Sequence, residues 1–298
     1  MKHLITDIQR FSLNDGPGIR TTVFFKGCNM RCAWCHNPET LSTDQDLMFY
    51  PKRCIGCGKC FSACPVGAHK VEKGVHVIDR TVCQKCGKCA AVCYAEALVM
   101  SGREMTVDEI MSEIRQDKAY YEASGGGVTL SGGEVLCHSD FATSLARACH
   151  AEGISVAIET NLSLPYERAL PLLREVDVLM ADLKLFDDEA HKKYTGLSNK
   201  TILENLTRIT DIPLIVRTPL IPNVTATAEN LRAIASFLSG KENLIYYQLL
   251  NFNPLGDVKY QSLDAHNPFA ADRPFTDGEM QAFGAWLSDI PVNVKVGE

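Results

Sequence analysis

Three features that mark common protein classes are missing from this chain of 298 residues. No run of about 18 apolar residues occurs, so we expect no transmembrane helix and no membrane partner. The first ten residues, MKHLITDIQR, lack the apolar region of a signal peptide, so we expect a cytoplasmic location. The net charge is −6 and no cluster of Lys and Arg stands out, which argues against a nucleic-acid partner. We expect a monomer.

Cysteine is the residue type that departs from an ordinary composition. Apolar residues make up 46% of the chain and charged residues 22%, as in a globular protein large enough to bury a core. Of 13 cysteines, however, 11 fall between positions 28 and 93. In a chain that is not exported, such density favours metal or redox chemistry over disulfides.

Strand and helix patterns alternate along most of the chain. Runs typical of strands occupy residues 21–25, 128–130, 154–158, 176–183, 214–218 and 244–250. Runs typical of helices occupy residues 106–122, 138–152, 165–175, 188–194, 202–209, 226–238 and 276–288. Repeated strand–helix units imply a parallel sheet, and about six of them predict an α/β fold with a partial (β/α)6 barrel. Its site is expected at the carboxyl ends of the strands.

The first cysteine group directly follows the predicted strand 21–25. Cys28, Cys32 and Cys35 have the spacing C-x3-C-x2-C. Three thiolates in one loop can bind three irons of a cubane cluster, and the fourth iron then keeps an open position, as catalytic metal sites do. The alternatives are a zinc site with a distant fourth ligand, or plain buried cysteines.

The other cysteines form two similar runs in residues 47–101, which we predict to be an insert in a barrel made of residues 1–46 and 102–298. Each run has the spacing C-x2-C-x2-C-x3-C of bacterial ferredoxins, whose fourth cysteine binds the other cluster. This rule predicts two 4Fe-4S clusters, one held by Cys54, Cys57, Cys60 and Cys93, and one by Cys64, Cys83, Cys86 and Cys89. A pair of zinc sites is the alternative. A short strand is expected at 74–78.

The segment GCNMRCAWCHNPE around Cys28, preceded by NDGPGIRTTVF, resembles the signature of radical S-adenosylmethionine (SAM) enzymes. Its CHNPE ending resembles the activating enzymes of glycyl radical enzymes, the pyruvate formate-lyase activating enzyme family, in the subgroup with a two-cluster ferredoxin-like insert. The resemblance implies three 4Fe-4S clusters and SAM. In that family the open iron binds SAM, and one electron cleaves it to methionine and a 5′-deoxyadenosyl radical. The resemblance implies that this radical abstracts a hydrogen from a glycine of a partner enzyme.

The resemblance also implies roles for residues at the strand ends. Ser131-Gly132-Gly133-Glu134 resembles the motif that binds the SAM amino group, although Val135 stands where the family usually has proline. Lys184 is expected to neutralise the SAM carboxylate, and Asp182 to face the ribose or a monovalent cation. The residues expected to bind cofactor are Trp34, Gly132, Gly133, Glu134, Glu159, Thr160, Asp182, Lys184 and Asn253. The cation is expected near Glu159, Thr160, Met180 and Asp182.

Several roles stay open at this stage. His191 and Arg217 are as easily structural as functional, and Cys137 and Cys149 have no ligand spacing. The insert could relay electrons from a reduced flavodoxin or ferredoxin, stiffen the fold, or form a docking surface. The whole chain could act on a small molecule instead of a protein, or could only transfer electrons.

Overall fold

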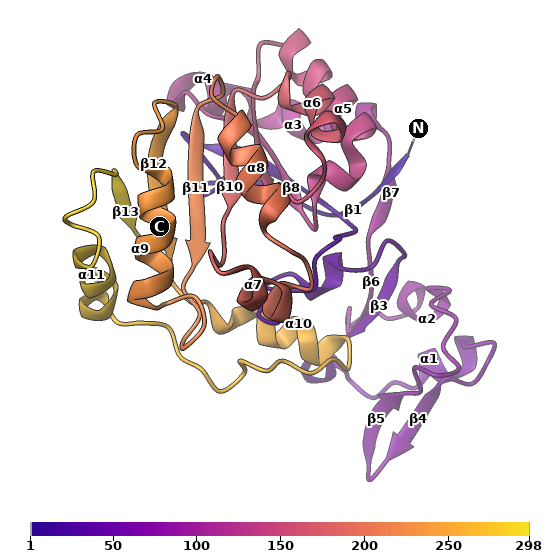
Figure 1. The fold of residues 1–298 in the computed structure, drawn as a ribbon. Coiled ribbons are helices and arrows are strands. Elements are labelled where there is room, and N and C mark those ends of the chain that lie inside the picture. The colour runs from indigo at the N-terminus through magenta and orange to yellow at the C-terminus, as the bar shows by residue number, and fades with distance from the viewer. Residues whose placement is uncertain (1, 298) are drawn as a thin grey trace.

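The computed structural model describes residues 2–297, and its largest element is an open sheet of nine strands in the order β13-β12-β11-β10-β9-β8-β2-β1-β7 (Figure 1). The strands are β1 (His3–Ser12), β2 (Arg20–Phe25), β7 (Arg103–Met105), β8 (Gly127–Gly132), β9 (Ser155–Thr160), β10 (Val178–Asp182), β11 (Leu214–Pro219), β12 (Leu244–Leu250) and β13 (Val294–Val296). From β2 through β8 to β13 every neighbouring pair is parallel, whereas β1 runs antiparallel to both of its neighbours.

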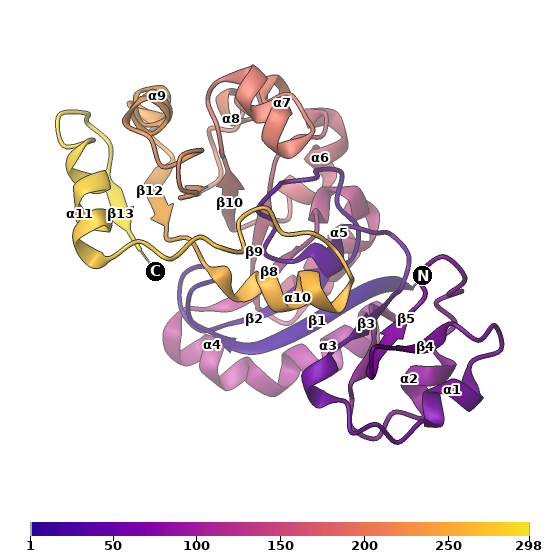
Figure 2. The ribbon, with the colours of Figure 1, turned by 90° about the horizontal axis from the view of Figure 1, so that it is seen from below.

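All six predicted strands are present, as β2 and β8 to β12, and they are followed by helices. The helices of this part of the chain are α3 (Val107–Ile114), α4 (Lys118–Ser124), α5 (Ser139–Ala151), α6 (Tyr166–Leu173), α7 (Asp188–Thr195), α8 (Lys200–Arg208), α9 (Ala228–Leu238), α10 (Asp257–Ser262) and α11 (Asp277–Ala285). Figure 2 shows α7 and α10 on either side of the loop that follows β2. The carboxyl ends of the parallel strands meet at this end of the sheet.

The helix predicted for residues 106–122 is broken in the structure. A 3-10 turn, Arg115–Asp117, separates α3 from α4. The break turns the Asp117 carboxylate into the molecule, where it accepts a hydrogen bond from Thr21 Oγ1 at 2.7 Å and pairs with Arg10. The flanking strands β1, β7 and β13 were not predicted. β7 and β13 are short edge strands and β1 lies next to β7, and strands that are short or largely polar carry a weak hydrophobic signal.

Apolar side chains of the sheet and the helices form one large core. Val23, Phe25, Leu130, Ile158 and Val216 are all completely or almost completely buried in it. Packing of this kind fixes the strands rigidly, so the polar residues at their carboxyl ends are held in place by the core beneath them.

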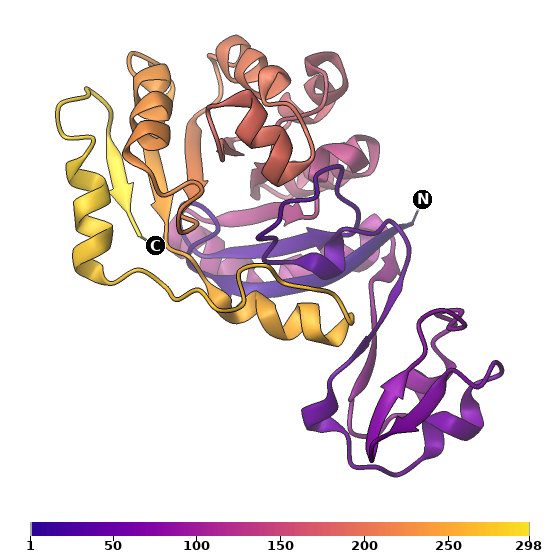
Figure 3. The same ribbon diagram turned by 60° about the horizontal axis from the view of Figure 1, so that its bottom comes forward.

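Residues 46–101 form a small unit with a core of its own (Figure 3). Its elements are β3 (Asp46–Phe49), α1 (Lys59–Ala63), β4 (His69–Glu72), β5 (Val75–Ile78), α2 (Lys88–Ala91) and β6 (Leu98–Ser101). β3 pairs with β6 where the chain leaves and re-enters the barrel, and β4 pairs with β5 as a hairpin, which includes the strand expected at 74–78. The small apolar core packs against cysteines from both runs.

Within residues 2–297, no helix has both the length and the apolar character needed to cross a lipid bilayer.

Candidate active site

The loop that carries the first three cysteines is held by the end of helix α7. Arg31 N and Ala33 N donate hydrogen bonds to the carbonyl oxygens of Thr195 and Tyr194, at 2.8 and 2.9 Å. Backbone bonds of this kind do not depend on a ligand. The loop is therefore shaped by the protein itself.

The thiols of this loop lie close together and are largely withdrawn from solvent. Burial raises the pKa of all three, that of Cys35 to about 12. The Cys28 thiol also lies near enough to Cys32 and Cys35 for their charges to act on it. The raised pKa values mean that burial disfavours the charged thiolates. A bound metal would offset this, because a coordinating metal deprotonates a thiol and neutralises the thiolate. The three thiols thus fit the iron–sulfur cluster that the sequence predicts.

The two glycines after β8 let the cysteine loop approach the sheet. A Cβ atom on Gly132 would lie 2.3 Å from both N and O of Phe25, and Gly132 has a φ of +114°. A Cβ on Gly133 would lie 2.3 Å from the carbonyl oxygen of Gly27. Gly133 N also donates to Phe25 O at 2.8 Å. The glycines were expected to admit a ligand, but in the structure they admit the backbone of the loop itself.

Glu134 lies just after β8, as expected, and its side chain is held by hydrogen bonds within the protein. Its side chain is 1% exposed, and both oxygens accept hydrogen bonds from the protein. Oε1 accepts from Leu136 N at 3.0 Å and from Thr160 Oγ1 at 2.6 Å, and Oε2 accepts from Asn161 N at 2.7 Å. This carboxylate therefore joins the end of β8 to the end of β9, and a SAM ammonium group bound to it would share it with these three donors. Thr160 is engaged by the same bond, so the structure assigns both side chains to holding the site together.

Four side chains of alternating charge lie across the ends of β9, β10 and β11. Arg217 Nη1 is 2.6 Å from Glu159 Oε1, and Arg217 Nε is 3.6 Å from Asp182 Oδ1. Lys184 Nζ is 2.6 Å from Asp182 Oδ2. Ser131 Oγ donates to the second oxygen of Glu159. The parallel register places Asp182 directly opposite Arg217, which explains why these motifs meet although they are far apart in the sequence.

The charges of this network are coupled to the cysteine loop through Lys184. Burial alone would raise the pKa of Asp182, but Lys184 and then Arg217 hold it below its ordinary value. Burial alone would lower the pKa of Lys184, but Asp182 and then Cys32 raise it. Lys184 therefore stays charged and lies within electrostatic reach of the predicted cluster ligands. An anionic group bound here would have to share Lys184 with Asp182.

The predicted monovalent cation would face competition at this place. Its two expected carboxylates, Glu159 and Asp182, are already paired with Arg217 and Lys184. Met180, a third expected neighbour, lies 4.0 Å from Arg217 through its sulfur. The positively charged side chains of Arg217 and Lys184 thus already neutralise these carboxylates, and the bound monovalent cation stays a prediction.

Two expected cofactor residues lie outside the charged network. Trp34 is 9% exposed and packs with Leu185, Ile221 and Phe252 in a small apolar cluster formed by loops at the same end of the sheet. Asn253 is exposed, and its Oδ1 accepts a hydrogen bond from Leu255 N at 3.0 Å, which caps a 3-10 turn. The prediction that Asn253 binds cofactor gains no contact from the structure, because its side chain serves this local turn.

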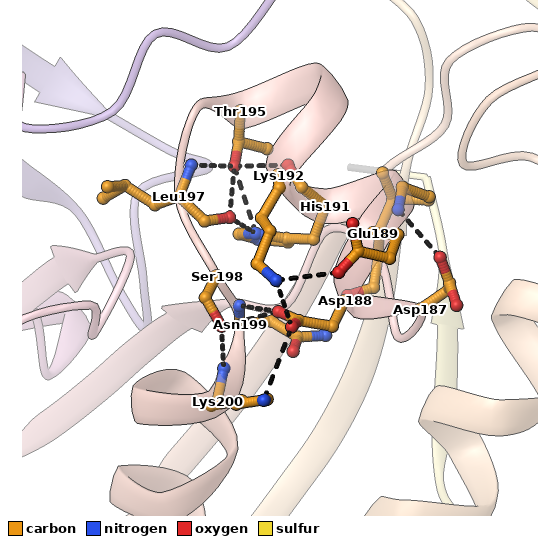
Figure 4. A network of polar contacts seen from close by, with 12 residues as sticks. Asp187, Asp188, Glu189, His191, Lys192, Thr195, Leu197, Ser198, Asn199 and Lys200 are labelled. Carbon is orange, nitrogen blue, oxygen red and sulfur yellow. Dashed lines mark hydrogen bonds and ion pairs between the residues drawn. The ribbon is translucent and has the colours of Figure 1, made fainter.

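His191 organises the end of helix α7 (Figure 4). It is completely buried, and its Nδ1 lies 2.6 Å from Leu197 O and 3.0 Å from Thr195 Oγ1. Gly196 ends the helix in the left-handed conformation, with a φ of +82°. Because the carbonyl of Thr195 receives Arg31 N of the cysteine loop, His191 supports that loop indirectly.

The insert contains a cavity of about 450 Å³ whose lining includes Cys54, Cys57, Cys60 and Cys93. These are the four residues assigned to one cluster by the ferredoxin rule. The cavity is much larger than the space of about 30 Å³ that one water molecule occupies in the liquid, so it has room for a larger group. Cys89, one of the second set, has its pKa raised to about 11 by burial, with contributions from Cys83 and Cys64. Cys93 of the second run thus lines one cavity with three cysteines of the first run, and Cys64 of the first run lies near Cys83 and Cys89, while the two clusters stay a prediction.

Sequence reasoning missed two histidines in the insert. His76 lines the same cavity, and its Nε2 lies 2.9 Å from Nδ1 of His69. Atoms of both rings and Cys60 Sγ all lie within 4.8 Å of one another. The only signal in the sequence was the alternation of apolar and polar residues in the strand that contains His76. Alternation alone does not show whether a histidine side chain faces a cysteine or the solvent. Cys137 is exposed and Cys149 is buried in the main core, as expected for thiols without ligand spacing.

Comparisons with known proteins identify the family of the chain. Residues 22–238 match the radical SAM superfamily. The chain is 39% identical over 293 residues to the indoleacetate decarboxylase activating enzyme of Tractidigestivibacter scatoligenes, covering 94% of this chain and 92% of that one. It is 43% identical over 269 residues to the benzylsuccinate synthase activating enzyme of Thauera aromatica, covering 87% and 81%.

One solved structure resembles the fold over most of the length of this chain. SuiB of Streptococcus suis, bound to the precursor peptide SuiA, aligns with a TM-score of 0.52 at 11% identity and covers 91% of this chain and 46% of that one. At this identity the likeness concerns the fold alone. From the family match and the activating-enzyme relatives, the chain belongs to the radical SAM superfamily and is, within it, an activating enzyme of a glycyl radical enzyme.

Proposed function

We propose that SAM cleavage takes place between the cysteine loop and the charged strand ends, with Cys28, Cys32 and Cys35 as the ligands of the catalytic 4Fe-4S cluster. The observation that carries this proposal is the backbone contact between the cysteine loop and the end of β8, where Glu134 N donates a hydrogen bond to Gly27 O at 2.9 Å and Gly133 N donates to Phe25 O at 2.8 Å. When bound, the cluster and SAM supply one electron and a 5′-deoxyadenosyl radical, which removes a hydrogen atom from a glycine of the partner.

The residues of this chain position the cofactor and exclude water. Lys184 offers the positive charge for the SAM carboxylate, in exchange for part of its pairing with Asp182. Gly132 and Gly133 keep the cluster loop pressed on the sheet, and Glu134 locks the neighbouring strand end. Trp34 and its apolar neighbours shield the site on one side. No group has to act as a general acid or base, because the step transfers a hydrogen atom.

The proposal includes an insert, residues 47–101, with two further 4Fe-4S clusters. Its support is the cavity lined by Cys54, Cys57, Cys60 and Cys93, together with the separate small core. We propose that these clusters relay electrons from a reduced flavodoxin or ferredoxin in the cytoplasm.

The function is tested by mixing the anaerobically reconstituted enzyme with SAM, dithionite and a candidate partner enzyme. A doublet from a glycyl radical in the electron paramagnetic resonance (EPR) spectrum of the partner is the expected result. Cys32→Ala should abolish the signal, whereas Cys137→Ala, which changes an exposed thiol, should leave it intact.

The second candidate is a radical SAM enzyme that acts directly on a small molecule. It predicts 5′-deoxyadenosine formation that depends on the small molecule and not on a protein partner. Turnover of that kind, with no glycyl radical in any partner supplied, would replace the proposal above.

A further inference from the structure

The two halves of the insert differ in one chemical respect, although their cysteine runs have the same spacing. The hairpin β4–β5 follows only the first run, because after the second run the chain returns to the barrel through β6 and β7. This hairpin carries His69 and His76, the two histidines of residues 47–101. Leu98 stands at the position of the second run that corresponds to His69, 29 residues later. Imidazole groups therefore accompany one cluster site and not the other.

His76 lies directly against two cysteine sulfurs of the first site. Its Nδ1 is 3.8 Å from Cys54 Sγ, and its Nε2 is 4.0 Å from Cys60 Sγ. Both distances are within the range of hydrogen bonds to sulfur. The ring is held in place by Phe49 and Phe61, whose centroids are 4.5 and 5.1 Å away. Packing on this scale leaves the ring little freedom to turn away from the sulfurs.

The close contact between His69 and His76 couples the protonation of the two rings, because one nitrogen has to donate and the other to accept. His69 is buried and His76 is partly buried, so both rings are held inside the insert. A neutral imidazole has one N–H, and the hydrogen bond made by one ring nitrogen fixes the state of the other. If His69 Nδ1–H donates to His76 Nε2 across the 2.9 Å contact, the proton of His76 resides on Nδ1 and points toward Cys54 Sγ. The pair is thus built to present an N–H group to a thiolate.

We propose that His76, oriented by His69, donates an N–H···S hydrogen bond to the cluster held by Cys54, Cys57, Cys60 and Cys93, and so raises its reduction potential above that of the second insert cluster. Hydrogen bonds to the sulfurs are one of the factors that set cluster potentials, because a donor stabilises the extra negative charge of the reduced state. His76 is a positioning and tuning residue in this account, not a cluster ligand. The inference rests on the proposed insert clusters.

The two cluster sites of the insert differ in how close they lie to the rest of the protein. The cavity at the His76 site is lined by insert residues alone. Cys83 of the second site instead borders a groove that it shares with Leu4 and Arg103 of the barrel. The cluster next to His76 is therefore the outer one. It is reduced first as the potential falls, and it can hold an electron before the inner cluster receives it.

The experiment is an EPR-monitored redox titration of the full-length protein in which Cys28, Cys32 and Cys35 are changed to alanine, so that only the insert clusters contribute. Iron and sulfide analysis first establishes whether both insert clusters are present. If they are absent, the proposed insert chemistry fails independently of His76. If they are present, two distinct potentials are expected.

In this background, His76→Phe keeps a ring between Phe49 and Phe61 but removes the N–H donor. We expect one of the two potentials to fall, by an amount equivalent to about a tenfold change in the ratio of reduced to oxidised cluster, or about 59 mV for one electron. The other potential should not move. His76→Gln retains an N–H donor and should keep most of the original value, and His266→Phe, a change at an exposed residue, should have no effect.

Two results would overturn the inference. One is full cluster content with both potentials unchanged in His76→Phe. The other is loss of one cluster from His76→Phe and from His76→Gln alike, which would make His76 a ligand and not a hydrogen-bond donor.

Discussion

At the scale of single residues, the site depends on buried groups whose partners come from other strands. Glu134 shows this best, because its motif predicts a ligand for SAM whereas its three hydrogen bonds all go to the protein. The glycines beside it are needed for contact with the cysteine loop. Motif positions can therefore act by shaping the site as well as by touching the cofactor.

Replacing Glu134 by Gln tests this role. One amide N–H₂ would then face Thr160 Oγ1 or Asn161 N, which are donors in the structure. Leaving a buried donor without its acceptor costs about 1–3 kcal/mol, so the free energy of unfolding should fall by that amount. Denaturant titration of the anaerobic protein measures the change. Glu189→Gln on the exposed face of α7 should change it by less than about 0.5 kcal/mol. An equally small effect at Glu134 would contradict the buried role.

The sequence names candidate site residues but does not predict their contacts. The spacing of the cysteines predicts the ligands of each cluster, and that assignment stays a prediction. Neither the pairing of Arg217 with Glu159 nor the position of His76 followed from the sequence. Both depend on the register between strands or on a hairpin, which brings together residues that are distant along the chain.

At the scale of elements, the cysteine loop is held between the end of β8 and the end of α7. Gly133→Ala should disturb this arrangement, because the new Cβ would lie 2.3 Å from Gly27 O and 2.9 Å from Thr40 O. Backbone cannot move aside cheaply, so we expect loss of the catalytic cluster and at least a tenfold slower SAM cleavage. Gly278→Ala, at an open position near the start of α11, is the matched control and should retain both. Cluster content and 5′-deoxyadenosine formation report the outcome, and a fully active Gly133→Ala enzyme would refute the packing argument.

The role of the insert is tested by Cys54→Ala. Loss of one insert cluster should slow SAM cleavage driven by a protein reductant, since the relay is interrupted. Cleavage driven by dithionite, which can reach the catalytic cluster by itself, should change less. Rates of 5′-deoxyadenosine formation with the two reductants separate these cases. A folded variant with an unchanged rate from the protein reductant would remove the relay and leave the insert a structural role.

The elements themselves follow the sequence closely where hydrophobic periodicity is strong. The six parallel strands and most helices lie within a few residues of their predicted bounds. The exceptions have local causes. The 3-10 turn Arg115–Asp117 breaks the helix predicted for 106–122 and allows the Asp117 carboxylate to reach Thr21, and α10 lies in a segment without a clear apolar stripe.

At the scale of the whole molecule, charge is divided unevenly between barrel and insert. Residues 47–101 contain eight Lys and Arg but three Asp and Glu, although the chain as a whole has a net charge of −6. The insert is therefore basic although the net charge of the chain is negative, and its Lys and Arg residues are spread along the sequence and do not form one dense run. Complementary charge favours an electron donor with an acidic surface.

This charge division predicts salt dependence of electron delivery. Charges more than a Debye length apart are screened, and this length is about 10 Å at 0.1 M salt and about 3 Å at 1 M. Reduction of the insert by an acidic flavodoxin or ferredoxin should slow several-fold between these conditions. Stopped-flow absorbance measures the rate. A rate independent of salt would argue that the basic insert does not guide the donor.

The central claim is that the radical made at the strand ends removes a hydrogen atom from a glycine of a partner enzyme. It is tested most directly with a partner whose glycine residues carry deuterium, treated with this enzyme, SAM and a reductant, followed by mass spectrometry of the 5′-deoxyadenosine. The account predicts 5′-deoxyadenosine that has gained one deuterium, in step with the glycyl radical signal. Product without deuterium, formed while the glycyl radical appears, would contradict it.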